Sequence, residues 1–388
     1  GKEDPGVPEG FRVVRFRNFK YIYEMSTAKI WVDSCRKEYC IKKKNQYYMQ
    51  TWHGGFAFKK VERAVESELD PRYVRQAKRD AKQTDVMLSN SNASSKVYRE
   101  DFWYDGEILQ KGLPRNDRLF NFTDEDVKSV RESVGIEDGV RLLLYAPTFR
   151  KNHGFQAYTL DYERCCKSLE KRFGGKWKIL LRMHPGIFDA ADSISFDERF
   201  VINASHYPDI QDLYIISDFL ITDYSSVIFD FALLKRRAAF YAVDIDDYMS
   251  DRGFYFSLFG FPFEVCQNND EAEKMILNFD DKAYFEKLNE FLNEQDFSDN
   301  GKAADAAGIQ FRMLNRGKGP AVYSLRVQAD RRRYQEIMKE TLETQENLVL
   351  HQAEIVSIGL TDGHVSSVTT HTGAVYAVRA VVIATGTY

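Results

Sequence analysis

The sequence has few cysteines and no long apolar run, and each shortage excludes a class of protein. Only five of its 388 residues are cysteine, an odd number without the spacing of a metal site. We therefore expect a reduced, cytoplasmic setting. Neither a signal peptide nor an apolar run approaching the length of a membrane span is visible. The net charge is -4, so no overall basic field favours nucleic acid as the main partner.

The length of the chain and a regular alternation of segments are its main positive features. A chain of 388 residues is long enough for two or three domains, although it begins with Gly1 rather than Met, as is typical of a fragment. Strand-like and helix-like segments alternate from about residue 30 to about residue 243. This alternation predicts parallel sheets with helices on both faces. Two such series predict two Rossmann-like halves in an α/β fold.

The expected elements follow from hydrophobic periodicity and from turn residues. Strands are predicted at residues 46–52, 85–88, 107–111, 141–145, 176–183, 200–203, 219–221 and 239–243. Helices are predicted at residues 71–83, 92–101, 161–173, 210–217 and 227–234.

The run 221–230 is the most informative single stretch. An apolar strand stops there in a cluster of small polar side chains, and a helix starts at once, with Ser225 or Ser226 as the N-cap. Unpaired backbone N–H groups and the helix dipole at such a start hold a phosphate without any lysine. An ordinary strand-to-helix turn with a serine cap remains the alternative.

Polar and titratable side chains follow most of the predicted strands. Ligands of such folds bind at the carboxyl ends of the strands. We therefore expect a cleft between the two halves. The residues at these ends are His53, Ser89, Thr148, Arg150, His184, Asp223 and Ser226.

Six motifs occur in an order that resembles the CDP-glycerol glycerophosphotransferases, which are teichoic acid primases and polymerases. They lie at residues 52–54, 113–117, 145–150, 182–185, 222–226 and 251–255. The resemblance covers roughly residues 10–300 and implies a GT-B-like fold. It assigns the acceptor to residues 1–118 and CDP-glycerol to residues 119–301. Family members usually begin with further strands of the first half, so we expect this half to be truncated.

The resemblance also implies a reaction and two catalytic residues. An acceptor hydroxyl attacks the distal phosphorus of CDP-glycerol and CMP leaves, which requires a base and groups that hold diphosphate charge. His53 is the implied base. His184 is implied to bind the diphosphate or the departing CMP. A purely structural histidine is the alternative for each residue taken alone.

Further polar residues complete the predicted substrate site. Thr148 and Arg150 are expected to bind phosphate, and Arg182 to neutralise diphosphate charge. Asp223 is expected to accept a hydrogen bond from a ribose or glycerol hydroxyl, and Ser225 and Ser226 to donate hydrogen bonds to phosphate. Asp230 is expected to brace the loop from the helix, and Arg252 to close over the donor. The alternatives are a solvated Arg150, a surface ion pair for Arg182, an exposed helix carboxylate for Asp230 and a simple turn at Arg252.

No metal and no cofactor are expected. Residues 244–247 (Asp-Ile-Asp-Asp) are interpreted as a solvated turn after a strand, with a carboxylate metal site as the alternative. Helix dipoles and arginines hold a diphosphate without a cation.

Because teichoic acid acceptors are lipid-linked, we expect peripheral binding at the inner face of the cell membrane. The basic face of the helix at 71–83 could lie on anionic lipid there, with a solvated helix surface as the alternative.

Residues 302–388 do not continue the motif pattern of the glycerophosphotransferase family. They resemble an interior slice of the FAD-binding enzyme that makes the carboxymethylaminomethyl modification of the tRNA wobble uridine. FAD binding is not expected, because no Gly-x-Gly-x-x-Gly turn occurs. A helix at 327–346 and strands at 348–358, 364–370 and 375–383 predict a small α+β segment. We interpret it as a fused or misassembled remnant, with a genuine two-domain fusion as the alternative.

The main predicted function is transfer of glycerol phosphate from CDP-glycerol to a hydroxyl of a lipid-linked glycerol phosphate acceptor. A tRNA-modifying flavoprotein acting through residues 302–388 and a nucleotide-sugar glycosyltransferase of the same fold are the alternatives. The sequence does not distinguish glycerol from ribitol in the donor.

Overall fold

The structure is a computed structural model that divides into two compact units, unit 1 (Gly1–Phe311) and unit 2 (Arg312–Tyr388). It describes residues 13–14, 16, 18–37, 41–148, 159–183, 196–245, 253–307, 311–314, 324–327, 349 and 352–382.

The first half of unit 1 is built on a four-stranded parallel sheet with the order β1-β2-β3-β4. Its elements are α1 (Phe19–Thr27), β1 (Ile30–Asp33), β2 (Tyr47–Gln50), η1 (Glu62–Glu68), α2 (Pro71–Gln83), β3 (Val86–Ser89), α3 (Asn92–Asp101), β4 (Glu107–Gln110) and η2 (Pro114–Leu119).

The second half of unit 1 contains a six-stranded parallel sheet with the order β10-β9-β8-β5-β6-β7. Its elements are α4 (Asp124–Val134), β5 (Val140–Tyr145), α5 (Tyr162–Phe173), β6 (Lys176–Leu181), β7 (Val201–Asn203), α7 (Ile210–Ile216), β8 (Phe219–Thr222), α8 (Val227–Ala232), β9 (Arg237–Tyr241), η5 (Leu258–Gly260), β10 (Glu264–Cys266), α10 (Asn269–Leu277) and α11 (Asp281–Glu294). Helix α12 (Ala303–Ala307) follows and contacts η2 of the first half.

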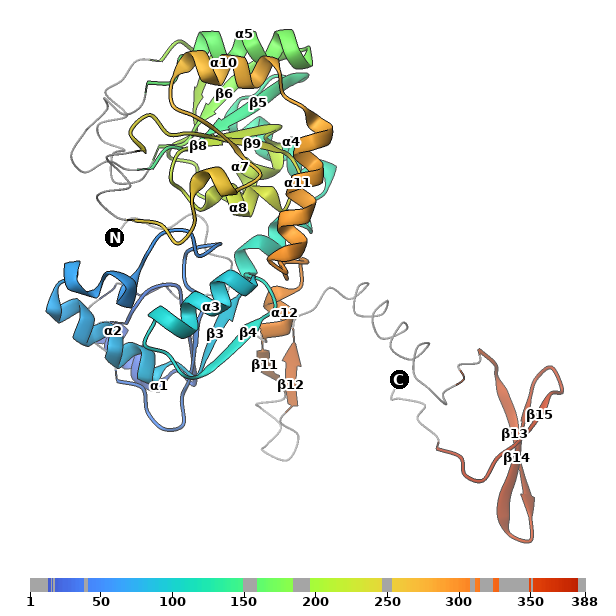
Figure 1. The fold of residues 1–388 in the computed structure, drawn as a ribbon. Coiled ribbons are helices and arrows are strands. Elements are labelled where there is room, and N and C mark those ends of the chain that lie inside the picture. Colours follow the sequence, from blue (N-terminus) through green and yellow to red (C-terminus); the bar gives the residue numbers. More distant parts are fainter. Residues whose placement is uncertain are drawn as a thin grey trace. The chain divides into compact units, whose positions relative to one another are not determined.

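Helices cover both faces of the six-stranded sheet. Figure 1 shows α5 and α10 on one face and α7 and α8 on the other. All four residues of β8 are consequently buried, as expected of a parallel strand between two helical layers. The predicted parallel sheets of the two halves are confirmed.

Local signals explain where the helices begin and end. Asp70 caps α2 by accepting from the backbone N–H of Arg72, and Pro71 occupies the first turn, where its missing N–H costs nothing. The predicted bounds of α2 and α3 are confirmed. Thr123 and Asp126 form a capping box at the start of α4, which the sequence analysis did not predict.

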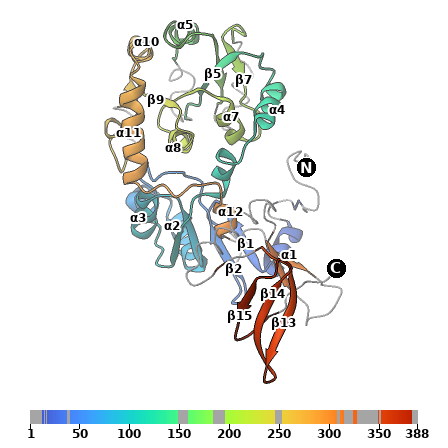
Figure 2. The ribbon, with the colours of Figure 1, turned by 90° about the vertical axis from the view of Figure 1, so that its right-hand side faces the viewer.

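The chain returns to the first half after α11. Figures 1 and 2 show α11 running along the side of the second half toward the first. At its end, the carbonyl of Gln295 accepts from Asn92 N at 2.9 Å, and Ser298 N donates to the carbonyl of Asn90 at 2.9 Å. Residues 295–299 therefore belong to the junction between the two halves.

Unit 2 is a β structure in its described part. Strands β11 (Phe311–Leu314) and β12 (Ser324–Val327) form one sheet, and β13 (Ile355–Thr361), β14 (His364–Thr370) and β15 (Val375–Ala377) form an antiparallel sheet. The three strands predicted for the tail are confirmed in kind. The predicted helix at 327–346 is wrong at Val327, which ends β12, and the rest of it lies outside the described residues.

None of the helices in the described part of the chain combines the length and apolar character that crossing a bilayer requires. The domain boundaries expected at residues 118 and 301 stay predictions.

Candidate active site

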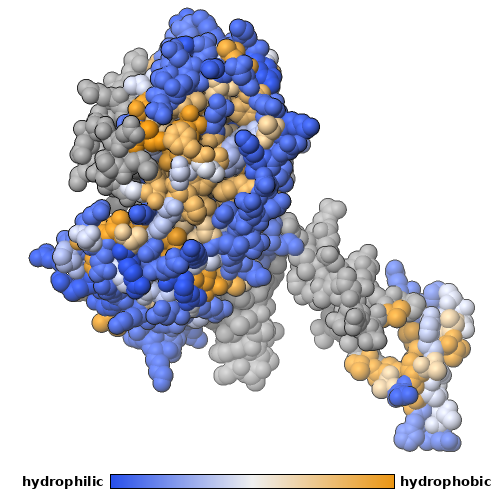
Figure 3. Space-filling view, in the orientation of Figure 1, coloured by the Kyte–Doolittle hydropathy of each residue, from blue (hydrophilic) through white to orange (hydrophobic). Residues whose placement is uncertain are grey.

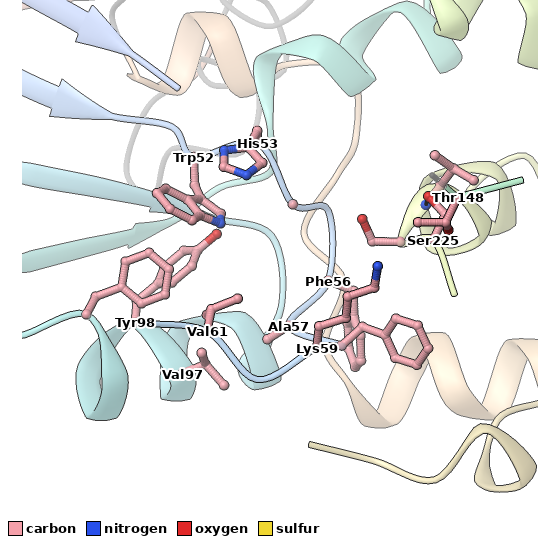
Figure 4. A pocket seen from close by; sticks show the side chains of 15 residues that line it. Trp52, His53, Phe56, Ala57, Lys59, Val61, Val97, Tyr98, Thr148 and Ser225 are labelled. Atoms are coloured by element: carbon pink, nitrogen blue, oxygen red, sulfur yellow. Dashed lines mark hydrogen bonds between the residues drawn. The ribbon is translucent and has the colours of Figure 1, made fainter. Parts of the chain in front are cut away.

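A cleft of about 610 Å³ lies in unit 1 and is lined by residues of both halves. The first half contributes Trp52, His53, Phe56 and Tyr98, and the second contributes Thr148, Ser225 and Ser226. Figure 4 shows Trp52 and His53 on one side of this cleft and Thr148 and Ser225 on the other. Four of the predicted site residues are thus brought together: His53, Thr148, Ser225 and Ser226.

His53 follows β2 on a backbone turned by Trp52, whose φ of 54° lies in the left-handed region. The imidazole Nδ1 lies 2.9 Å from the carbonyl oxygen of Ser34. A carbonyl oxygen only accepts, so Nδ1 carries a proton, and in the neutral ring the lone pair is on Nε2. The ring also packs against Trp52, with 4.3 Å between ring centroids. His53 therefore has the tautomer that a general base requires.

Thr148 and Asp223 join the ends of two neighbouring strands, β5 and β8. Thr148 N donates to both carboxylate oxygens of Asp223 at 2.9 and 3.0 Å, and Thr148 Oγ1 also donates to that carboxylate. Tyr224 N donates to the same group at 2.6 Å. Asp223 is only 4% exposed. The geometry gives Asp223 a bracing contact, and its predicted bond to a substrate hydroxyl stays a prediction.

Ser225 and Ser226 stand where β8 turns into α8, as predicted. Ser226 occupies the N-cap position, but its side chain makes no capping bond. The Oγ of Ser225 instead accepts from Val227 N at 3.4 Å. Helix α8 also ends at Ala232 rather than at the predicted Leu234. The Ser226 hydroxyl thus lines the cleft without bonding the helix start.

Asp230 on α8 joins the two halves through its carboxylate, and its predicted bracing of the neighbouring loop stays a prediction. It accepts from Arg115 Nη2 at 3.0 Å and from Asn116 Nδ2 at 3.0 Å, both on η2. It is 5% exposed, so the alternative of an exposed helix carboxylate is wrong. Burial is the largest single influence on the pKa of Arg115 and lowers it, but the charge and hydrogen bond of Asp230, together with Tyr214 and Tyr98, raise that pKa above its usual value.

Asp299 extends this network to the segment after α11. It accepts from Leu113 N at 2.9 Å, Asn90 Nδ2 at 2.9 Å and Asn116 Nδ2 at 3.2 Å. Burial raises the pKa of Asp299 to about 6. Sequence reasoning gave no role to Asp299, and it quoted residues 113–117 as a motif without assigning their contacts.

Arg182 anchors a loop rather than lining the cleft. Its Nη1 donates to the carbonyls of Ala204, Ser205 and Tyr207, the first at 3.2 Å. Desolvation lowers the pKa of Arg182. Arg182 therefore ties the end of β6 to the segment after β7, and its predicted contact with diphosphate stays untested.

Three predicted site residues, His184, Arg150 and Arg252, lie outside the described residues. The same holds for Asp246 and Asp247 of the considered metal site. Within the described ranges, no group of three or more His, Cys, Asp or Glu side chains is placed to hold a metal ion.

Lys59 is a cleft residue that sequence reasoning missed. Figure 4 shows its side chain extending toward the side of the cleft that holds Ser225. Its backbone lies between two hydrogen bonds that join the halves: Lys60 N to Gly253 O at 3.3 Å and Tyr255 N to Phe58 O at 3.0 Å. The sequence signal that could have indicated Lys59 as a cleft residue is its position five residues after the motif at 52–54.

Two parallel α/β halves with a cleft at their strand ends define the class of two-domain, GT-B-like proteins. The family described as CDP-Glycerol:Poly(glycerophosphate) glycerophosphotransferase matches residues 2–306, and the chain belongs to it. The GT-B-like fold is supported by the solved wall teichoic acid polymerase TagF, which covers 78% of this chain and 76% of its own at a TM-score of 0.68 and 33% identity. The predicted family resemblance is confirmed.

Curated relatives agree with this family. The teichoic acid poly(glycerol phosphate) polymerase of Staphylococcus epidermidis is 34% identical over 317 residues, which is 78% of this chain and 44% of the relative. The polymerase of the same name from Bacillus spizizenii is 34% identical over 259 residues, 64% of each chain. The chain thus spans less than two thirds of the length of these relatives.

The tail matches a second family. Residues 289–388 match the family described as glucose inhibited division protein A. The tRNA uridine 5-carboxymethylaminomethyl modification enzyme MnmG of Caldicellulosiruptor saccharolyticus is 57% identical over 88 residues, 23% of this chain and 14% of the enzyme. The predicted resemblance to an interior slice of such an enzyme is confirmed.

Proposed function

We propose that this chain transfers glycerol phosphate from CDP-glycerol to a hydroxyl of a lipid-linked polyol phosphate acceptor and releases CMP. The observation that carries the proposal is His53, whose Nδ1 donates to the Ser34 carbonyl and leaves Nε2 as the basic nitrogen of the neutral ring, beside a cleft whose opposite wall carries Thr148, Ser225 and Ser226. This places a base and hydrogen-bond donors on either side of one space, as an in-line phosphoryl transfer requires.

The step follows from these groups. The acceptor hydroxyl oxygen forms a bond to the distal phosphorus of CDP-glycerol, and its proton passes to Nε2 of His53. The bond between that phosphorus and the bridging oxygen breaks, and CMP departs with that oxygen. Ser225 and Ser226 donate to the phosphate oxygens, and Lys59 adds a positive charge from the first half. His184 is proposed, by its place in the family motif, to bind the diphosphate or CMP.

Glycerol is favoured over ribitol in the donor. The poly(glycerol phosphate) polymerases named above are 34% identical to this chain, whereas three ribitol-phosphate polymerases are 27%, 27% and 31% identical. A variant of TagF soaked with CDPG is also among the similar structures, at 32% identity. We therefore expect CMP release from CDP-glycerol to exceed release from CDP-ribitol.

The test is nucleotide release, measured as CMP from CDP-glycerol and CDP-ribitol and as the nucleoside phosphate product of a nucleotide sugar, each with and without a short lipid-linked glycerol phosphate acceptor. Acceptor-dependent release from CDP-glycerol is the expected result. Release from the nucleotide sugar alone would assign the chain to the glycosyltransferases instead.

We further propose that unit 1 binds the inner face of the cell membrane through α2. Four of its basic residues are exposed: Arg72, Arg75, Arg79 and Lys82. Each basic side chain near an anionic surface is worth about 1 kcal/mol. Sedimentation with anionic vesicles, but not with neutral ones, is expected, and reversal of Arg72 and Arg75 to Glu should reduce it.

A further inference from the structure

The loop that follows β1 holds the group that fixes the tautomer of His53. The carbonyl of Ser34 in this loop accepts from His53 Nδ1 at 2.9 Å. A backbone carbonyl cannot be replaced by mutation, so its position depends on whatever anchors residues 34–37. The neutral imidazole in water has two tautomers, and only a correctly placed acceptor at Nδ1 selects the one with a free Nε2.

Gln50 links this loop to the segment that carries His53. It is the last residue of β2 and is 0% exposed. Its Nε2 donates to the carbonyl of Cys35 at 3.0 Å, and its Oε1 accepts from Trp52 N at 2.9 Å. Nε2 also donates to the hydroxyl of Tyr48 at 2.9 Å. A single amide thus holds the residue after Ser34 and the residue before His53 at a fixed separation.

Arg36 anchors the same loop from the other side. Its guanidinium is buried and donates to Glu62 at 3.0 Å, to Asp80 at 3.2 Å and to the carbonyl of Phe102 at 3.2 Å. The guanidinium also lies 5.7 Å from the centroid of the Trp52 ring, which in turn packs on His53. The loop therefore has little freedom to withdraw the Ser34 carbonyl while Gln50 is in place.

We propose that Gln50 is a positioning residue for His53: its amide holds the Ser34 carbonyl against Nδ1 and so keeps Nε2 free toward the cleft. This rests on the proposed function, in which His53 is the base. Gln50 is buried and is not among the described residues that line the cleft. Its loss should consequently reduce kcat and leave the KM for CDP-glycerol nearly unchanged.

Two substitutions of Gln50 separate its donated bonds from its accepted one. Gln50→Leu removes all three bonds with little change in volume, whereas Gln50→Glu keeps the acceptor for Trp52 N and removes the donors to Cys35 and Tyr48. Gln46→Leu is the matched control, because Gln46 is also buried and its amide also bonds backbone groups, namely Lys43 N and the carbonyls of Met25 and Ala28. Gln46 lies before β2, at the end opposite His53.

The decisive readout is the tautomer of His53, measured by nitrogen-15 NMR of the full chain labelled at its seven histidines. The His53 signals are assigned by their loss in His53→Asn. Wild type and Gln46→Leu should show the proton on Nδ1. Gln50→Leu and Gln50→Glu should show a mixture with the proton on Nε2, together with a fall in kcat of about 10- to 100-fold.

The possible results distinguish the two proposals. If Nδ1 keeps its proton in both Gln50 variants, or lacks it in wild type, the role of Gln50 is wrong. If one Gln50 variant does not fold, the other decides. If His53→Asn retains CMP release, the proposed function of His53 fails, whereas the NMR comparison still decides whether Gln50 sets the tautomer.

Discussion

In unit 1 all four residues of β8 are buried, whereas in unit 2 six of the seven residues of β13 are exposed. Strand β8 pairs with a neighbour on each side, whereas β13 lies at the edge of its sheet and pairs with β14 alone. The layers differ as well. Helices α5, α10, α7 and α8 cover the six-stranded sheet of unit 1, whereas strands are the only regular elements in the described part of unit 2 beyond β12. Figure 3 shows apolar side chains on the surface of that small sheet. Strand pairing without a second layer buries little apolar surface.

The comparison extends from packing to chemistry. The cleft and the Asp230–Asp299 network lie in unit 1. The four tryptophans of the chain, Trp31, Trp52, Trp103 and Trp177, lie there too. Tryptophan fluorescence therefore reports the folding of unit 1, which allows the two units to be tested against each other with matched substitutions.

The largest expected effect is on the rate of CMP release, and it compares a histidine of unit 1 with a histidine of unit 2. Because a positioned general base contributes about 10²- to 10⁴-fold, His53→Asn should lower CMP release by that factor. His364→Asn is the control in unit 2, on the exposed start of β14, and should leave the rate unchanged. Equal loss in both variants would mean that unit 2 takes part in the reaction, which contradicts the comparison.

A second contrast concerns two leucines. Leu220 in β8 is 0% exposed, so Leu220→Ala should lower the free energy of unfolding of unit 1 by about 2–5 kcal/mol. Leu360 in β13 is 66% exposed, and Leu360→Ala should change the same transition by less than about 0.5 kcal/mol. Both are measured by tryptophan fluorescence in urea. A large effect of Leu360→Ala would show that the stability of unit 1 depends on unit 2.

The fold of unit 1 was largely predictable because its signals are local. Asp70 and Pro71 mark the start of α2, and the apolar run at 219–222 marks a buried strand. The capping box at Thr123 was available and overlooked, so α4 was missed through incomplete use of a local signal. In the tail, periodicity predicted β13, β14 and β15 in kind, but it missed β11 and β12 and placed the start of β13 at residue 348 rather than at Ile355. It also could not indicate whether a second layer covers the strands.

The site was predictable only at the strand ends. His53, Thr148, Ser225 and Ser226 were found because parallel strands end at one edge of a sheet. The contacts of Asp230 with Arg115 and Asn116 join residues more than 100 positions apart, and no local pattern reports such a pairing. The same holds for Gln50, whose role depends on a loop that packs against it in three dimensions.

A third prediction concerns pH. The pKa of Asp299 is about 6 in the folded chain against 3.8 for its ordinary value, because burial disfavours the charged form. The folded state therefore binds this proton more tightly than the unfolded state does. Protonation of Asp299 stabilises the folded state fully below about pH 4, and this stabilisation is lost as the pH rises through about 6. A difference of about two pKa units corresponds to about 3 kcal/mol.

The measurement is the urea midpoint of tryptophan fluorescence between pH 4 and pH 7. Asp299→Asn should flatten this pH dependence, whatever its effect on the midpoint itself. Asp362→Asn changes an exposed carboxylate in the turn after β13 and should leave the profile as in wild type. A profile that is unchanged in Asp299→Asn would assign the dependence to another group.

The smallest expected effect is on kcat/KM for CMP release, and it compares two neighbouring lysines of unit 1. Lys59 lines the cleft and extends toward Ser225, whereas Lys60 is exposed and lies against Gly253. Loss of one charge-assisted contact to phosphate costs about 1.5–3 kcal/mol, so Lys59→Met should reduce kcat/KM for CMP release by about 10- to 100-fold. Lys60→Met removes the same charge one residue away and should change it by less than about twofold, because an exposed charge is screened by solvent. If both variants lose activity equally, the effect belongs to the overall charge of the segment, and the direct contact of Lys59 with a phosphate group is wrong.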